Sequence, residues 1–134
     1  MKRAVALLSF AVVAVACTSA ARTETQQLVI AVDRFRKAEN AEKPSHVDAI
    51  KQSPCTDAEV CAARATCLES AEATSKGLSL TAQAAQLMKT VTAGDDTKPI
   101  ERMLDDAKKS NEDGMKKLGE CDDKLIALKR KHGV

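Results

Sequence analysis

Apolar side chains recur at helical spacing along most of this chain. Residues 24–40 carry them on one face, at intervals of three and four, at Leu28, Ala31, Val32, Phe35 and Ala38. This spacing predicts an amphipathic helix with one stripe turned toward a core. The next segment, residues 40–54, contains Pro44 and Pro54 and predicts a connector. Within it we expect Ser45 to cap a single short turn.

A second helix is expected to begin at a capping signal. Thr56 and Glu59 have the spacing of a capping box, which predicts Thr56 as the N-cap with Glu59 reaching back. The apolar positions that follow have coiled-coil intervals and are Val60, Cys67, Ala71, Leu78, Ala85 and Met88. Gly77 interrupts this stripe. Because Gly inside a helix costs about 0.5–1 kcal/mol relative to Ala, we expect a kink or break near residues 75–79.

The clearest turn is at residues 93–99, where Gly94 ends one helix and Pro99 starts the next. The last helix is then expected over residues 99–131. Its apolar stripe is Leu104, Ala107, Asn111, Gly114, Leu118, Cys121, Leu125 and Leu128. Its outer face has acid-to-base pairs four residues apart, which favour a helix: Asp105–Lys109, Glu112–Lys116, Asp113–Lys117 and Glu120–Lys124.

These elements predict an all-α fold, a long antiparallel helical hairpin with an additional N-terminal helix, similar to a three-helix bundle. Residues 17–54 hold the first helix and the connector, residues 55–134 hold the hairpin, and we expect both parts to form one domain. Trp and Tyr are absent, and beyond the first 21 residues Phe35 is the only aromatic residue. A core so poor in large side chains is thin, so covalent staples would matter.

The chain begins with Lys2 and Arg3, an apolar run over residues 4–16, and then small residues. This order is typical of a secretory signal. It predicts export from the reducing cytosol, where cysteines are bridged rather than catalytic. The apolar run is shorter than the ~20 residues that a membrane-spanning helix needs, which argues against an uncleaved anchor.

The segment Ala14-Val15-Ala16-Cys17 resembles the lipobox of bacterial lipoproteins, although that motif usually has Leu where this chain has Ala14. The resemblance implies cleavage after residue 16, a diacylglycerol on Cys17 and a lipid-anchored protein in the cell envelope. The alternative is a signal of 1–20 or 1–21, cut after Ala20 or Ala21, which discards Cys17 and releases a soluble protein.

Four cysteines remain in either case, and helical geometry favours one pairing. Cys67 lies 27 residues before Gly94 and Cys121 lies 27 residues after it, so an antiparallel hairpin sets them opposite each other. A Cys61–Cys67 bridge is unfavourable, because six helical residues rise about 9 Å and bridged Cα atoms lie within about 7 Å. Cys55 precedes the helix and can fold back, so we predict Cys55–Cys61 and Cys67–Cys121.

Gly77 falls near Asn111 and Gly114 when the hairpin is reflected in the same way. Small residues let backbones approach closely, so the simplest interpretation is a close helix crossing. A small groove or a hinge is the functional alternative.

We expect no catalytic residue, no cofactor and no metal site. His46 and His132 lie in the connector and at the tail, where we expect both to face solvent. The acidic pairs at residues 95–96, 105–106 and 122–123 are ordinary in turns and on solvated surfaces. The cysteine intervals are longer than those of zinc sites. No sequence motif of a hydrolase or phosphate-binding loop occurs.

Charge narrows the choice of partner. Without Lys2 and Arg3, the 21 basic residues become 19 and balance 19 acidic ones, which argues against nucleic acid. The basic end at residues 129–132 suits the C-terminal dipole of a helix, with phospholipid contact as the alternative.

The leading hypothesis is therefore a small, non-enzymatic cell-envelope lipoprotein that holds a helical interaction module at a membrane for an unknown protein partner. A second hypothesis is a soluble secreted helical protein, such as a chaperone, an inhibitor or a carrier of an apolar ligand. A third, a metal- or thiol-dependent enzyme, requires free thiols.

Overall fold

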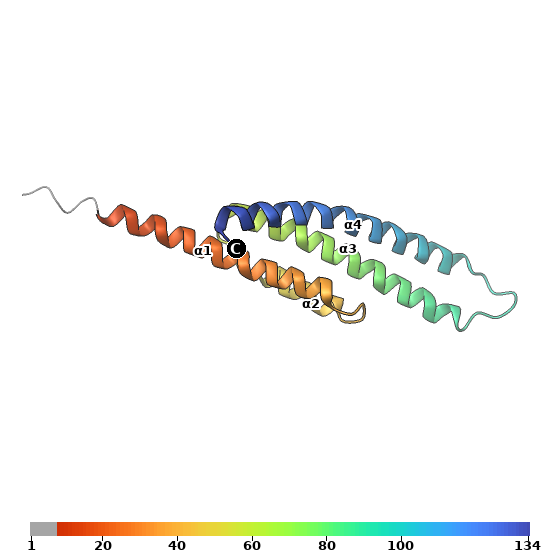
Figure 1. Ribbon diagram of the computed structural model, residues 1–134. Helices are drawn as coiled ribbons and strands as arrows, with labels where there is room; N and C mark the ends of the chain where they lie inside the picture. The colour runs from red at the N-terminus through yellow and green to blue at the C-terminus, as the bar shows by residue number, and fades with distance from the viewer. Residues whose placement is uncertain (1–7) are drawn as a thin grey trace, which may run out of the picture.

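The computed structural model describes the backbone of residues 8–134 and the side chains of residues 20–134. It contains α1 (Leu8–Lys37), α2 (Lys43–Gln52), α3 (Ala58–Met88) and α4 (Lys98–His132), with no strand in that part of the chain. The long helices α3 and α4 form an antiparallel hairpin, and α1 and α2 lie against it (Figure 1). The all-α fold with a helical hairpin is confirmed.

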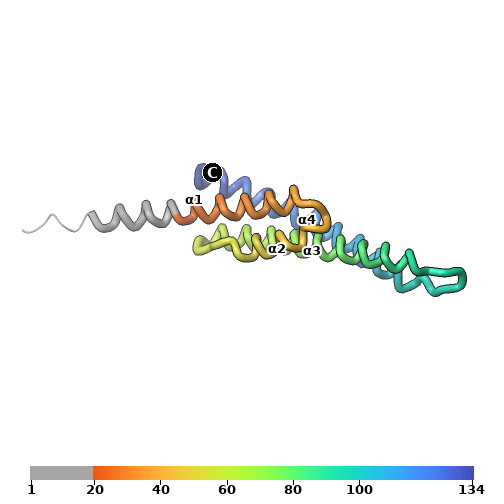
Figure 2. The backbone as a smooth tube through the Cα atoms, turned by 90° about the horizontal axis from the view of Figure 1, so that it is seen from below, coloured from red at the N-terminus to blue at the C-terminus, as the bar shows by residue number. Residues whose placement is uncertain are grey.

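Helices α1 and α2 cover only part of the length of the hairpin. In both views α1 and α2 lie along the end where α3 begins and α4 finishes, and the other end projects beyond them as a pair of helices (Figure 2). We call this projecting part, residues 76–110, the distal arm. We call the opposite end of the hairpin the base.

The hydrophobic core lies in the half near the base. Its buried members are Leu28, Ala31, Val32, Phe35, Ile50, Val60, Ala63, Cys67, Ala71, Cys121, Leu125 and Leu128. The predicted stripe of the first helix supplies the first four, which confirms its orientation. Lys43 closes the end of α1, because its Nζ donates to the carbonyls of Phe35 (2.9 Å) and Arg36 (3.0 Å).

The connector prediction is wrong, because most of that segment is α2. Pro44 sits in its first turn, where the missing N–H would have had no partner inside the helix. Ile50 is buried and Val47 is partly buried, so packing against the core stabilises the helix. Ser45 is not its N-cap, and its hydroxyl donates to the carbonyl of Glu42 (2.7 Å).

The start of α3 also differs from the capping box. Asp57 is the N-cap, and its carboxylate accepts from the N–H groups of Glu59 (2.9 Å) and Val60 (3.1 Å). The hydroxyl of Thr56 donates instead to the carboxylate of Glu24 on α1 (2.6 Å). A hydrogen bond to a charged carboxylate is stronger than one between neutral groups. Thr56 therefore bonds to Glu24 of α1 and does not form the predicted capping box.

The helix limits differ in two further places. Helix α1 begins at Leu8, well before residue 24, and ends at Lys37. Helix α3 continues through Gly77 without the expected break. The turn and the last helix agree with the sequence, since Gly94 has a positive φ of 102° in the loop and α4 spans Lys98–His132. The prediction that Gly94 ends the preceding helix is wrong, because α3 ends at Met88 with Lys89 as its C-cap.

The seam between α3 and α4 follows small residues. Buried positions recur every seven residues, at Ala63, Ser70, Gly77 and Ala84 in α3 and at Ile100, Ala107, Gly114, Cys121 and Leu128 in α4. The predicted stripe is therefore wrong in the distal arm, where Ala85, Met88 and Leu104 are exposed. Small side chains bring the backbones together, and the Ser70 hydroxyl donates to the carbonyl of Gly114 (2.9 Å).

Gly77 is required at this crossing. A Cβ there would overlap the Asn111 side chain, with its Cγ at 2.7 Å, and would lie 3.0 Å from the carbonyl oxygen of Ala107. This confirms the close crossing predicted from the reflected register.

Replacing Gly77 with Ala should lower the free energy of unfolding by about 1–3 kcal/mol, the usual cost of overpacking. Gly119→Ala is the matched control, because nothing lies within 4 Å of its Cβ position. That change should stabilise the helix by about 0.5–1 kcal/mol. Urea unfolding followed by circular dichroism measures both, and a Gly77→Ala variant as stable as Gly119→Ala would contradict the close crossing.

Candidate functional site

The structure pairs the cysteines as the spacing favours. Cys67 on α3 and Cys121 on α4 form a buried disulfide with their Cα atoms 4.8 Å apart. Cys55, in the segment before α3, is joined to Cys61 in its first turns, with Cα atoms 5.1 Å apart. The first bridge fixes the register of the hairpin, and the second fixes the chain entering α3.

These bridges indicate an oxidising compartment and therefore an exported protein. None of the helices in the described part of the chain is long and apolar enough to cross a membrane. Cys17, the candidate lipidation site, lies outside the residues whose side chains are described. Its modification is taken up below as a proposal.

Metal-ligating side chains are scattered over the molecule. Among the residues with described side chains, no group of three or more His, Cys, Asp or Glu could hold a metal ion. His46 on α2 and His132 at the end of α4 are both partly exposed. The prediction that both face solvent does not hold for His132. His132 packs at the base, where its Nε2 is buried without a hydrogen-bond partner among the described residues.

The acidic pairs have local structural roles. Asp95 accepts from the N–H (2.7 Å) and hydroxyl (2.8 Å) of Thr92 in the hairpin loop, which lowers its pKa. Asp96 accepts from the N–H of Lys98 (3.0 Å) at the start of α4. Asp122 forms an ion pair with Arg36 of α1. These contacts of Asp95, Asp96 and Asp122 hold the hairpin loop, the start of α4 and the packing of α1 on α4.

The ion pairs of α4 differ from the four that were predicted along its face. Lys117 pairs with Glu69 of α3 (3.1 Å), and Lys131 pairs with Glu59 of α3 (2.9 Å). Hydrogen bonds from Lys117 to Glu69 and then Glu120 raise the pKa of its ammonium group. The close approach of the two helices brings acids of α3 within reach, so cross-helix pairs form beside the pairs within α4, which are Lys108–Glu112 and Lys117–Glu120.

A buried carboxylate ties α1 to the start of α3. Glu24 is 7 % exposed and accepts from the N–H of Thr56 (2.9 Å to each oxygen), the hydroxyl of Thr56 and the N–H of Asp57 (3.2 Å). Burial raises its pKa, but these hydrogen bonds outweigh burial, so the pKa lies below its ordinary 4.5. Sequence reasoning missed this contact because its partners are far apart in the chain.

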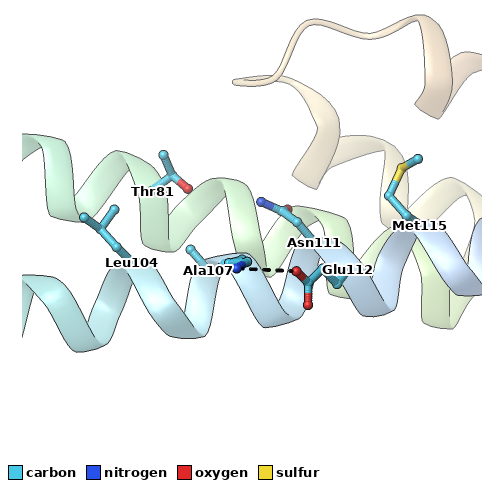
Figure 3. A pocket seen from close by; sticks show the side chains of 7 residues that line it. Thr81, Leu104, Ala107, Asn111, Glu112 and Met115 are labelled. Atoms are coloured by element: carbon cyan, nitrogen blue, oxygen red, sulfur yellow. Dashed lines mark ion pairs between the residues drawn. The ribbon is translucent and has the colours of Figure 1, made fainter.

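A hollow lies along the distal arm and the adjoining turn of α4. Thr81 of α3 and Leu104, Ala107, Asn111 and Met115 of α4 line a shallow groove of about 530 Å³. Figure 3 shows these side chains on one side of the hairpin, with the ion pair between Lys108 and Glu112 at the edge. Met115 is 70 % exposed and Leu104 is 40 % exposed, so large apolar side chains face solvent here.

Two neighbouring hollows extend this groove. Thr81 also lines a hollow under the turn between α1 and α2, and Leu104 also lines one near the hairpin loop. The three hollows therefore form a continuous surface, which we call the distal groove. Its lining is Asn40, Ala41, Pro44, Leu78, Ser79, Thr81, Ala82, Ala85, Met88, Val91, Thr97, Ile100, Glu101, Leu104, Ala107, Lys108, Asn111, Glu112 and Met115.

The distal groove continues the site that α1 occupies nearer the base. On α4, the face with Leu104, Asn111 and Met115 carries Asp122 at helical spacing, and Asp122 contacts Arg36 of α1. Beyond the turn between α1 and α2, that face has no covering helix (Figure 2). The groove is thus a part of this face that no helix of the described residues covers.

Comparisons with protein-family models, with curated proteins and with solved structures find no match to this chain.

Removal of one disulfide should destabilise the domain more than removal of the other. In the chain-entropy model a loop of 54 residues contributes about 4 kcal/mol and one of six residues about 2 kcal/mol. Cys67→Ala/Cys121→Ala should therefore lower the free energy of unfolding about twice as much as Cys55→Ala/Cys61→Ala. Urea unfolding of the two double variants measures this, and equal losses would contradict the structural role of the hairpin bridge.

Glu24→Gln should destabilise the domain by about 1.5–3 kcal/mol near neutral pH, the usual contribution of a charged hydrogen-bonded group. The folded pKa is lowered, so this contribution is present above about 4.5 and is lost as the pH falls through the folded pKa. The difference in the free energy of unfolding between the native protein and Glu24→Gln should therefore become smaller below pH ~4.

Urea unfolding at several pH values tests this dependence. Asp95→Asn in the hairpin loop is the control, because its lowered pKa comes from Thr92 and not from contact between helices. A gap for Glu24→Gln that stays constant with pH would show that ionisation of Glu24 does not support the fold.

Proposed function

We propose that this protein is a non-enzymatic lipoprotein of the cell envelope, anchored through Cys17, that presents a helical interaction module to another protein. The observation that carries the proposal is the distal groove, a largely apolar and uncovered surface toward the end of the hairpin opposite the base. The resemblance of Ala14-Val15-Ala16-Cys17 to a lipobox supports the anchor.

The shape suits a spacer. Helix α3 has 31 residues, which at 1.5 Å per residue gives a reach of about 46 Å from the base to the hairpin loop. A partner on the distal arm would therefore be bound well clear of the membrane surface. The buried core and both disulfides lie near the base and hold the hairpin rigid where it meets the anchor.

The occupant that fits the distal groove is an amphipathic helix of the partner. Helix α1 is the example within the chain, since it fills the same face nearer the base with Leu28, Val32 and Phe35 at intervals of three and four. A partner helix with the same spacing would continue the line of α1 and cover Leu104 and Met115. Recognition of this kind reads apolar anchors on one helical face.

Packing at the start of the domain favours cleavage before Cys17 over a cut after Ala21. Ala21 is buried, and its carbonyl accepts from the hydroxyl of Thr25 (2.8 Å). A cut after Ala21 would remove that packed residue. A cut after Ala20 keeps it and is the route to the alternative function, a soluble secreted helical binding protein that uses the same groove.

The mass of the mature N-terminus decides between these two. Cleavage before Cys17 with an added diacylglycerol is the expected result. A mature chain that starts at Ala21 or Arg22 would contradict the anchor and leave the soluble alternative.

Site-specific photo-cross-linking in cells tests the groove. A photoreactive residue at Met115 should yield a discrete adduct with a protein, and Leu104→Glu in the same chain should abolish it. The matched control is the same probe at Ile126, which is also exposed (48 %) but lies outside the groove. An adduct from both positions, or one that survives Leu104→Glu, would contradict binding in the groove.

A further inference from the structure

Charge is segregated along the hairpin although the exported part of the chain is neutral overall. The base comprises residues 21–27, 49–62 and 124–134. Its six basic residues are Arg22, Lys51, Lys124, Lys129, Arg130 and Lys131, and its three acidic residues are Glu24, Asp57 and Glu59. Three contacts join the middle of α1, the segment after α2 and the end of α4 to the start of α3, and they are Glu24–Thr56, the Cys55–Cys61 bridge and Glu59–Lys131.

Every acid side chain of the base is already engaged within the fold. Glu24 accepts from Thr56 and Asp57, and Asp57 caps α3. Glu59 pairs with Lys131. By contrast, Arg22, Lys51, Lys129 and Arg130 make no ion pair with any residue whose side chain is described. The base therefore presents uncompensated positive charge to solvent.

The middle of the molecule has the opposite balance. Residues 28–48, 63–75 and 110–123 hold 11 acidic residues and seven basic ones. The acids are Asp33, Glu39, Glu42, Asp48, Glu69, Glu72, Glu112, Asp113, Glu120, Asp122 and Asp123. We call these three ranges the negative belt, which lies between the positive base and the distal arm.

The base is also the end nearest the proposed anchor. Three residues separate Cys17 from Ala21, the first buried residue among those whose side chains are described, and the two Cα atoms lie at most about 14 Å apart even when the chain between them is fully extended. Electrostatic attraction to a charged surface extends over about 8 Å at physiological salt. A chain acylated on Cys17 would therefore hold the base within or close to the range of the lipid headgroups.

We propose that the base of this domain binds the anionic headgroups of the membrane that carries the anchor. The free cations of Arg22, Lys51, Lys129 and Arg130 would attract anionic phospholipid, while the negative belt is repelled from the same surface. The two effects together hold the hairpin upright, so that the distal groove points away from the membrane. The biological setting rests on the proposed anchor at Cys17, but headgroup binding itself is measurable without it.

Binding is tested with the full chain carrying Cys17→Ser, which cannot be acylated. Binding of the protein to vesicles of phosphatidylcholine alone measures the contribution of the apolar leader. Vesicles that also contain phosphatidylglycerol add the electrostatic contribution to binding. We expect tighter binding to the anionic vesicles at low salt and no difference between vesicles at about 0.5 M salt, where screening is strong.

Lys129→Glu/Arg130→Glu should weaken the electrostatic part by at least about 30-fold, since each base near an anionic surface contributes about fivefold. The matched control is Lys89→Glu/Lys98→Glu, which makes the same change of charge on the distal arm and should leave most of the binding intact. Arg22→Glu/Lys51→Glu repeats the test from α1 and α2 if the first variant fails to fold, as judged by circular dichroism.

Equal binding to both kinds of vesicle would overturn the proposal. So would equal losses in the base and distal-arm variants, which would show an effect of net charge alone. Inorganic phosphate as a competitor separates the sources of the anion, because competition at millimolar phosphate would indicate a site for a free anion and contradict a headgroup surface. Failure of acylation at Cys17 is read separately from the N-terminal mass and leaves this result unaffected.

Discussion

The close packing of α3 against α4 is the constraint on which the rest of the structure depends. A chain with almost no aromatic residues cannot build a thick core, so its long helices are held by small side chains that let their backbones approach. Gly77 beside Asn111, Ser70 against the carbonyl of Gly114 and the Cys67–Cys121 bridge all belong to this one seam. It sets the register that places the core, the cross-helix ion pairs and the open groove.

The parts of the fold that follow from periodicity could be predicted from the sequence. Reflection about Gly94 places Cys67 opposite Cys121 and Gly77 opposite Asn111, because the rise per residue is the same in both helices. Elements decided by distant contacts could not be predicted. Helix α2 forms because Ile50 is buried against the core. Thr56 bonds to Glu24 instead of capping α3, and Lys117 pairs with Glu69 instead of with the predicted Asp113. Each of these partners lies in another helix.

The candidate site also has features that could be predicted from the sequence and features that could not. The cysteine pairs follow from spacing, but the distal groove does not, because it exists only where α1 and α2 stop covering the hairpin. The charge balance of the whole chain hides the positive base and the negative belt in a similar way. The two proposals use these two features, since they assign a membrane surface to the positive base and a partner helix to the distal groove.

The Cys67–Cys121 bridge lies in the half of the hairpin that is already packed against α1 and α2. The distal arm has no disulfide and no second layer of helices, and its two helices are held together by the hairpin loop and by the contacts around Gly77, Ala84, Ile100 and Ala107. Opening of the arm therefore requires far less free energy than global unfolding. Local unfolding at the loop end can therefore occur while the half that contains both disulfides and the core stays folded.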